Sequence, residues 1–182
     1  MTQTRLDGVG CYNPASERDH AMWAKLQDFC ASEPRAFERD PETGHVTGSA
    51  FVLSPDLSAV LLTHHAKLNR WLQLGGHCDG IADVPFVALK EAYEESGLSR
   101  ITPIGAEVFD VDVHEIPANA KEPAHLHYDV RFLFRAEGRD FKVSDESHDL
   151  AWVPIAELEQ MSDAPSVLVL RDKLARFLSG GA

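Results

Sequence analysis

The stretch LQLGGHCDGIADVPFVALKEAYEESGL, residues 72–98, holds a pair of glycines, an apolar run and then a concentration of acidic side chains. Asp83 is suited to cap a helix, Pro85 suits a first helical turn, and Gly97 suits a helix end. We therefore predict a helix over residues 83–96, and both the fold and the chemistry expected of the chain follow from it.

The predicted helix presents three glutamates on one side. At about 100° per residue, Glu91, Glu94 and Glu95 fall within an arc of roughly 100°, opposite the apolar residues. Such an arc is either a solvated acidic face or a ligand set. The glycine turn upstream favours the second interpretation, because its free carbonyls can point at the same place. Clustered carboxylates with a backbone carbonyl are the ligands that Mg²⁺ or Mn²⁺ prefers.

Residues 76–98 resemble the Nudix box, Gly-x5-Glu-x7-Arg-Glu-U-x-Glu-Glu-x-Gly-U, in which U is aliphatic. The positions that match in type and spacing are Gly76, Glu91, Glu94, Glu95, Gly97 and Leu98, with Ala92 acceptable at the first U. Two positions depart from the pattern. Ala82 stands where the family has its first Glu, and Lys90 stands where it has Arg. Asp79 and Asp83 are the carboxylates close enough in sequence to replace the missing Glu.

The resemblance implies a divalent-cation-dependent hydrolase that cleaves the pyrophosphate linkage of a nucleoside diphosphate joined to another moiety X. It implies that Glu91, Glu94 and Glu95 ligate Mg²⁺ or Mn²⁺ with help from the Gly75 carbonyl, and that Lys90 steadies Glu91 or a phosphate oxygen. Glu91, Lys90 and Glu146 form the expected catalytic set. Glu146 is the candidate general base in a later loop, with Asp145 and Asp149 as alternatives.

The rest of the chain predicts an α+β fold. We expect a helix over residues 16–32, strands at about 46–53, 59–64, 101–113 and 126–136, a short strand and helix in WVPIAEL, and a helix over residues 165–178. Together with the resemblance, this order implies a Nudix-like α/β/α sandwich with a mixed central sheet flanked by helices. Residues 1–40 are expected to form a helical extension packed on a single domain of residues 41–182.

Histidines gather around these expected strands. His125 and His127 alternate on one strand, and His77 follows the glycine pair. His77, His127 and Arg131 are expected to contact substrate. The alternative is that the H-x-H pair holds a transition metal, with His77 or His114 completing the site.

The composition and net charge limit the classes of binding partner that we expect. The 182 residues carry a net charge of -12, which argues against nonspecific binding to nucleic acid or to anionic membranes. No apolar run is long enough to span a membrane, and three cysteines without a C-x-x-C pair fit a reducing compartment. We therefore expect a cytoplasmic protein that binds a small nucleotide-type substrate, with a homodimer as one expected assembly.

A second class of function stays open. A module that keeps this fold but has lost turnover would bind or sense a nucleotide ligand, and Ala82 is the residue that favours it. The nucleotide and the moiety X are not specified by any motif.

Overall fold

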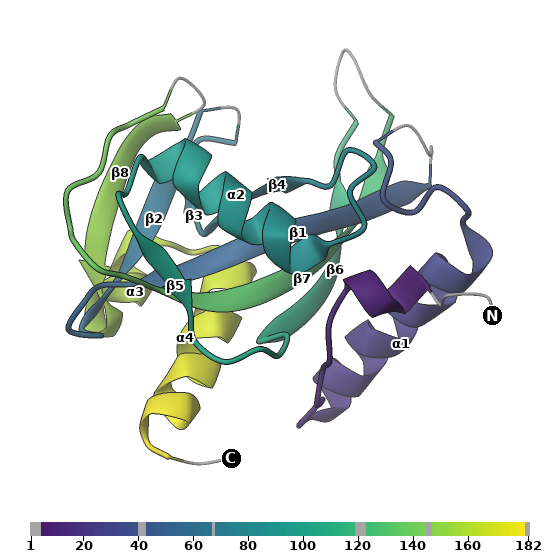
Figure 1. The fold of residues 1–182 in the computed structure, drawn as a ribbon, viewed down its shortest axis with the longest axis horizontal. Coiled ribbons are helices and arrows are strands. Elements are labelled where there is room, and N and C mark those ends of the chain that lie inside the picture. The colour runs from purple at the N-terminus through teal and green to yellow at the C-terminus, as the bar shows by residue number, and fades with distance from the viewer. Residues whose placement is uncertain (1–4, 40–42, 67, 119–122, 145–146, 181–182) are drawn as a thin grey trace. The chain divides into compact units, whose positions relative to one another are not determined.

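The computed structural model describes residues 5–39, 43–66, 68–118, 123–144 and 147–180 (Figure 1). The chain divides into two compact units. The first comprises residues 1–49, 75–91 and 105–132, and the second comprises residues 50–74, 92–104 and 133–182. The elements β1, α2 and β7 each continue from one unit into the other.

The fold is α+β, as predicted: a mixed sheet flanked by helices. The described strands are β1 (Gly44–Leu53), β2 (Ala59–His65), β3 (Arg70–Leu72), β4 (Leu74–His77), β5 (Ile101–Pro103), β6 (Asp110–Ile116), β7 (His125–Ala136) and β8 (Ser147–Pro154). The described helices are η1 (Arg5–Gly8), α1 (Glu17–Ser32), α2 (Val84–Ser96), η2 (Ile155–Glu157), α3 (Leu158–Met161) and α4 (Pro165–Leu178). The strand order is β3-β2-β1-β7-β5, with β4 beside β1, β6 beside β7 and β8 beside β2.

In the first unit, α1 packs against β6. The helix begins after Ser16, whose hydroxyl accepts a hydrogen bond from the Asp19 amide at 3.1 Å. Phe29 near its end stacks on Tyr128 of β7, with ring centroids 4.0 Å apart and planes 4° apart. Both rings are nearly buried, so this pair fixes α1 on the hairpin of β6 and β7.

In the second unit, β2 lies between β3 and β8, and both neighbours are antiparallel to it. The residues Val60, Leu61 and Leu62 of β2 are fully buried. The C-terminal helix α4 begins with Pro165 and buries Val167, Leu170 and Leu174 on one side. These positions recur at three and four residues, which is the spacing of one helix face.

One predicted strand was wrong. Residues 101–113 form two strands, because the chain bends between them and each part pairs with a different stretch of β7. Residues 101–103 of β5 pair with residues 134–136, whereas β6 pairs with residues 125–131. The short strands β3 and β4 were missed, and β8 starts well before the predicted WVPIAEL segment.

Both predicted ends of α2 are confirmed. The Asp83 carboxylate accepts a hydrogen bond from the Phe86 amide at 3.2 Å, which satisfies a free donor of the first turn. At the other end, Gly97 adopts φ +60° and its amide donates to the Tyr93 carbonyl at 2.9 Å. Within the described residues, no helix has both the length and the apolar character needed to cross a membrane.

Candidate active site and histidine cluster

The glycine turn touches the first glutamate of α2. A Cβ atom added at Gly76 would lie 2.5 Å from Oε2 of Glu91, so a larger residue there would push this carboxylate aside. A Cβ added at Gly75 would likewise lie 2.5 Å from Oγ of Ser49. The Lys90 ammonium donates to Oε1 of Glu91 at 2.7 Å. Gly76, Lys90 and Glu91 therefore form one contiguous group, in which lysine holds the carboxylate by a single contact where arginine could have used two.

The other two glutamates follow on the same helix and belong to the second unit. Glu94 is exposed, whereas Glu95 retains only 7% of its accessible surface. Residues three and four positions apart lie one turn apart on a helix, so both follow Glu91 along one side of α2. Glu146 and Asp145 lie outside the described residues. Asp149 is an exposed residue of β8.

Ala82 lies where the N-terminal segment approaches the loop before α2. A Cβ atom added at Gly8 would meet the Ala82 carbonyl, which shows how close the two backbones are. The two carboxylates that could replace the missing Glu are engaged elsewhere. Asp83 caps α2 and Asp79 pairs with Arg39 at 3.2 Å.

Three strands of the first unit share a polar face. Because side chains alternate along a strand, His45, Thr47 and Ser49 of β1 point to one side, and the same holds for alternate residues of β6 and β7. The antiparallel register places three polar pairs side by side: Asp110 with Arg131, Asp112 with Asp129, and His114 with His127. Thr47 and Ser49 both donate to Oδ1 of Asp129, at 2.9 and 2.8 Å. The face thus carries ionic groups at one end and imidazoles at the other.

Arg131 is the centre of the ionic end and is completely buried. Its guanidinium donates to Asp129 at 2.7 Å, Asp110 at 2.7 Å and Asp112 at 3.0 Å. Arg18 of α1 binds Asp110 and Asp112 from the other side, at 2.9 and 2.6 Å. Burial by itself lowers the pKa of Arg131, but the three carboxylates raise it above its ordinary value. The Arg131 side chain has no exposed surface, so its role is structural and the structure does not support the expected contact with substrate.

The imidazole end brings together His45, His77 and His127. One ring nitrogen from each lies within 4.8 Å of the others, and the Nε2 atoms of His45 and His127 are 3.1 Å apart. His127 is largely buried. Burial, and then the neighbouring histidines, lower the pKa of His127 to about 2, so its ring is neutral at physiological pH. Sequence analysis singled out His77 and His127 but missed His45, whose signal was the alternation His45, Thr47, Ser49 along β1.

Two further histidines border this cluster. The His125 ring centroid lies 5.0 Å from that of His45, and the His114 centroid lies 5.7 Å from that of His127. Nδ1 of His125 donates to the Pro123 carbonyl at 2.9 Å, and Nδ1 of His114 lies 3.1 Å from Oδ2 of Asp112. Because a carbonyl and a carboxylate only accept, both rings carry hydrogen on Nδ1.

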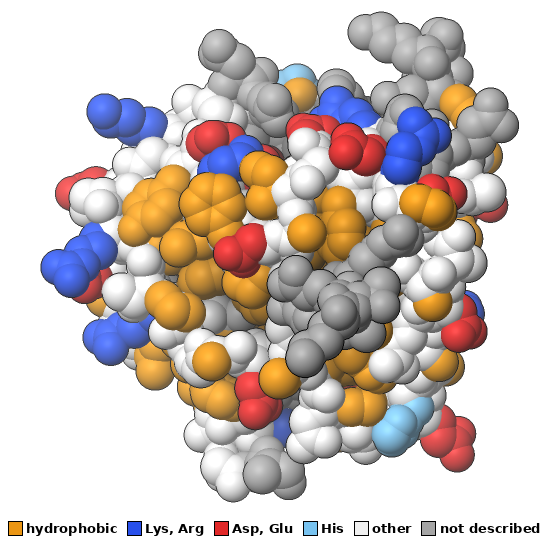
Figure 2. Space-filling model, turned by 45° about the vertical axis from the view of Figure 1, so that its right-hand side comes forward, with side chains coloured by type: hydrophobic (Ala, Val, Ile, Leu, Met, Phe, Trp, Pro, Cys, Tyr) orange, Lys and Arg blue, Asp and Glu red, His pale blue; other side chains and the backbone are white. Residues whose placement is uncertain are grey.

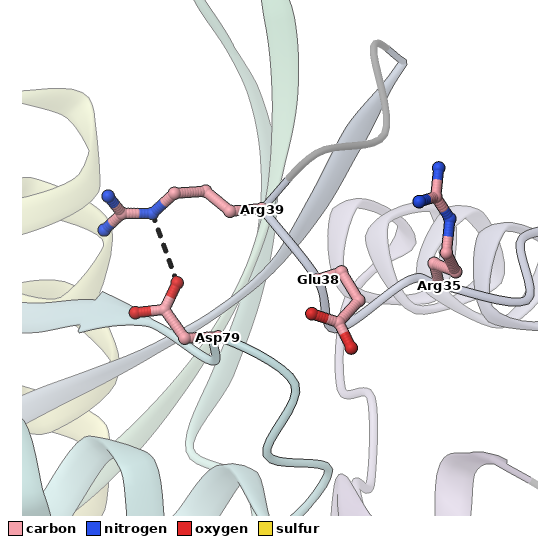
Figure 3. Close-up of a pocket in the computed structure, with 4 residues that line it drawn as sticks. All are labelled: Arg35, Glu38, Arg39 and Asp79. Carbon is pink, nitrogen blue, oxygen red and sulfur yellow. Dashed lines mark ion pairs between the residues drawn. The ribbon is translucent and has the colours of Figure 1, made fainter.

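A pocket of about 420 Å³ opens beside the loop that follows β4 (Figure 3). It is lined by Arg35, Glu38, Arg39 and Asp79. Figure 3 shows Arg39 reaching across to Asp79, while Arg35 and Glu38 come from the segment after α1. Nη2 of Arg39 also lies 2.7 Å from Nδ1 of His77. Arg39 therefore connects the pocket to the histidine cluster.

The charged side chains do not form a basic patch on the face drawn in Figure 2. There, the coloured Lys and Arg side chains are interspersed with Asp and Glu, and hydrophobic side chains lie between them. This distribution agrees with the net charge of -12.

Solved structures share this fold. The NUDIX domain of Shewanella oneidensis NrtR complexed with ADP ribose has a TM-score of 0.57 at 20% identity, covering 83% of this chain and 97% of its own. A Caenorhabditis elegans Ap4A hydrolase binary complex has a TM-score of 0.54 at 17% identity, covering 74% and 98%. The MutT protein from Methanosarcina mazei has a TM-score of 0.54 at 18% identity, covering 76% and 96%.

The comparison with curated proteins gives no significant match. A family model described as NUDIX domain matches residues 44–172, which span β1 to α4 and include the glycine turn and all of α2. Over most of its length, therefore, this chain belongs to the NUDIX domain family.

Proposed function

We propose that the protein hydrolyses the pyrophosphate linkage of a nucleoside diphosphate joined to a moiety X, using Mg²⁺ or Mn²⁺. The observation that carries the proposal is the group formed by Gly76, Lys90 and Glu91. The glycine leaves room for the carboxylate, and the lysine holds that carboxylate at 2.7 Å. A carboxylate that the fold positions this closely is pre-organised to bind a cation.

In this proposal Glu91, Glu94 and Glu95 of α2 bind the divalent ion, with the Gly75 carbonyl as a further oxygen ligand. All four are oxygen donors, so the donor set fits a hard cation. The ion supplies neutralisation of phosphate charge and activation of water. Lys90 has the role of orienting Glu91, and Glu146 is the proposed base that takes the proton from the attacking water.

Substrate contacts in the first unit would come from the pocket and from the histidines beside it. Arg35 and Arg39 present guanidinium groups to the pocket, and guanidinium groups bind phosphate oxygens by paired hydrogen bonds. His77 lies against Arg39, so it is the histidine best placed to join such a contact. His127 lies next to His77, with ring centroids 5.2 Å apart, and is the second proposed substrate contact among the histidines. A homodimer and a cytoplasmic location stay predictions.

The experiment is a product assay on a panel of nucleoside diphosphate derivatives, including ADP-ribose, dinucleoside polyphosphates, nucleoside triphosphates and nicotinamide dinucleotides, each with Mg²⁺, Mn²⁺ or chelator. The proposal expects metal-dependent release of two phosphate-bearing products from at least one member. Arg39→Gln should raise KM for that substrate more than it lowers kcat, because Arg39 binds rather than reacts. Hydrolysis that proceeds equally in chelator would contradict the proposal.

Ala82 favours a second candidate, a module that binds a nucleotide without turnover. The Glu of the family pattern is absent there, and the loop carbonyl instead lies against Gly8. This candidate expects a rise in melting temperature with a nucleotide of the same panel and no product with any metal ion. Running both measurements on the same panel separates the two candidates.

A further inference from the structure

We infer that His45, His77 and His127 form a binding site for a divalent transition-metal ion such as Zn²⁺, Co²⁺ or Ni²⁺, with no carboxylate of α2 among its ligands. Each histidine comes from a different strand: β1, β4 and β7. One ring nitrogen of each lies within 4.8 Å of the other two. Because the three imidazoles come from separate strands, the fold itself brings their nitrogens together.

The spacing of the nitrogens suits such an ion. In a tetrahedral site with metal–nitrogen bonds of about 2.0–2.1 Å, two ligand nitrogens lie about 3.3 Å apart. The Nε2 atoms of His45 and His127 lie 3.1 Å apart. A nitrogen of His77 lies within 4.8 Å of both, so an inward movement of this ring completes the triangle. Because three ligands leave a fourth position open, water or a substrate atom can occupy it.

The chemistry of the donors selects the class of ion. Neutral imidazole nitrogen is a borderline ligand that binds Zn²⁺, Co²⁺, Ni²⁺ and Cu²⁺, whereas Mg²⁺ and Mn²⁺ prefer oxygen. The crowding of four imidazole rings around His127 favours the neutral form that a metal needs. The two kinds of donor thus separate the ions: oxygen ligands on α2 for a hard cation, nitrogen ligands here for a softer one.

The surrounding contacts resemble the outer partners of bound metals. Asp112 holds Nδ1 of His114, and the Pro123 carbonyl holds Nδ1 of His125. Such contacts fix the hydrogen on one nitrogen and turn the other toward an ion. Both rings border the three central histidines, so the Nε2 atom of either is the candidate for a fourth ligand.

Arg39 competes with a metal ion for His77. Its Nη2 lies 2.7 Å from Nδ1 of His77 and, as a donor, occupies the single lone pair of that neutral ring. A metal ion can bind His77 only after Arg39 releases it. The Arg39 side chain is about half exposed and also pairs with Asp79, so it has an alternative partner when it leaves. Metal binding and the arginine contact are therefore competing states of one ring.

The test uses untagged, full-length protein freed of metal by chelator and then given excess Mg²⁺ to occupy the oxygen ligands of α2. Co²⁺ and Zn²⁺ are titrated by calorimetry, and the visible absorption of Co²⁺ reports its coordination. We expect one ion per chain and the absorption bands of a four- or five-coordinate nitrogen site. His77→Gln should weaken binding roughly 100-fold or more, because even groups that only orient a ligand change affinity by about 10–100-fold.

Three further variants make the result decisive. His127→Gln should also weaken metal binding. If His127→Gln does not fold, His77→Gln still tests the site. Arg39→Gln should tighten binding, because it removes the competitor for His77. His20→Gln, an exposed histidine of α1, is the matched control and should leave the affinity unchanged.

The inference is overturned if wild-type protein binds neither ion under these conditions, or if His77→Gln and His127→Gln both bind as well as wild type. It is equally overturned if Glu94→Gln, and not the histidine variants, abolishes Co²⁺ binding. The assay reads metal affinity directly, so its outcome is independent of whether the protein hydrolyses a nucleotide.

Discussion

Removing the buried guanidinium of Arg131 should destabilise the protein more than any other single change in the ionic face. Arg131→Met keeps most of the side-chain volume but leaves Asp110, Asp112 and Asp129 without their shared cation. Breaking a buried ion pair by deleting one partner typically costs about 3–5 kcal/mol. The three contacts do not add up to three such penalties, because every carboxylate keeps another donor.

The remaining donors are specific. Asp129 still accepts from Thr47 and Ser49, and Asp110 and Asp112 still bind Arg18. We therefore expect a loss of about 3–5 kcal/mol in the free energy of unfolding for Arg131→Met. Arg18→Met is the matched control. Its side chain is 31% exposed and water can replace it, so the expected loss is about 1 kcal/mol.

Urea unfolding followed by circular dichroism measures both values. Arg131→Lys should fall between wild type and Arg131→Met, since lysine keeps the charge but cannot reach three carboxylates. The double variant Arg131→Met/Asp129→Asn should lose less than the sum of its single variants, because the second change removes one uncompensated charge. An Arg131→Met variant no less stable than Arg18→Met would refute the view that this network depends on the buried guanidinium.

Three more predictions concern the same unit. Gly76→Ala should lower the rate of metal-dependent hydrolysis by roughly 100-fold, because its Cβ displaces the Glu91 carboxylate, whereas Gly138→Ala, with open space around it, should not change the rate. Burial raises the pKa of Cys78 to about 12, so thiol labelling of native protein at pH 8 should modify exposed Cys11 and spare Cys78; equal labelling would contradict the buried position. In metal-free protein, the pKa of His127 is about 2, against 6.5 in the unfolded chain, so its contribution to the free energy of unfolding is full above about pH 6.5 and declines as pH falls toward 2. His127→Gln should flatten this decline. An unchanged pH profile of the free energy of unfolding would contradict the prediction.

Sequence alone predicted the parts of the fold that depend on local patterns. The caps of α2 could be predicted because Asp83 and Gly97 act within a few residues of their own positions. The break between β5 and β6 could not, since it depends on which stretch of β7 each half pairs with. Short strands such as β3 carry too few residues to show an alternation.

The candidate site, like the fold, could be predicted from the sequence only in part. The spacing of the glutamates along one side of α2 follows from helical geometry, so it could be predicted. Which side of α2 is buried could not: Val84 and Glu95 are buried, whereas Phe86 is 51% exposed. The burial of Arg131 depends on Asp110 and Arg18, which come from distant segments, and a sequence pattern on β7 alone does not reveal them. His45 meets His127 across 82 positions of sequence, so only the arrangement of β1 and β7 brings the pair together.

The central claim is that the Glu91 carboxylate, beside the glycine turn, binds the divalent ion that activates water for attack on a phosphorus atom. The most direct measurement is hydrolysis of the best substrate of the panel in ¹⁸O-labelled water with Mg²⁺, comparing wild type, Glu91→Gln and the exposed control Glu107→Gln. We predict that one phosphate-bearing product contains one oxygen from the solvent. The rate of Glu91→Gln should be at least about 100-fold lower than that of wild type, and the control should keep the wild-type rate. Products without the label, or a Glu91→Gln variant as fast as wild type, would contradict the claim.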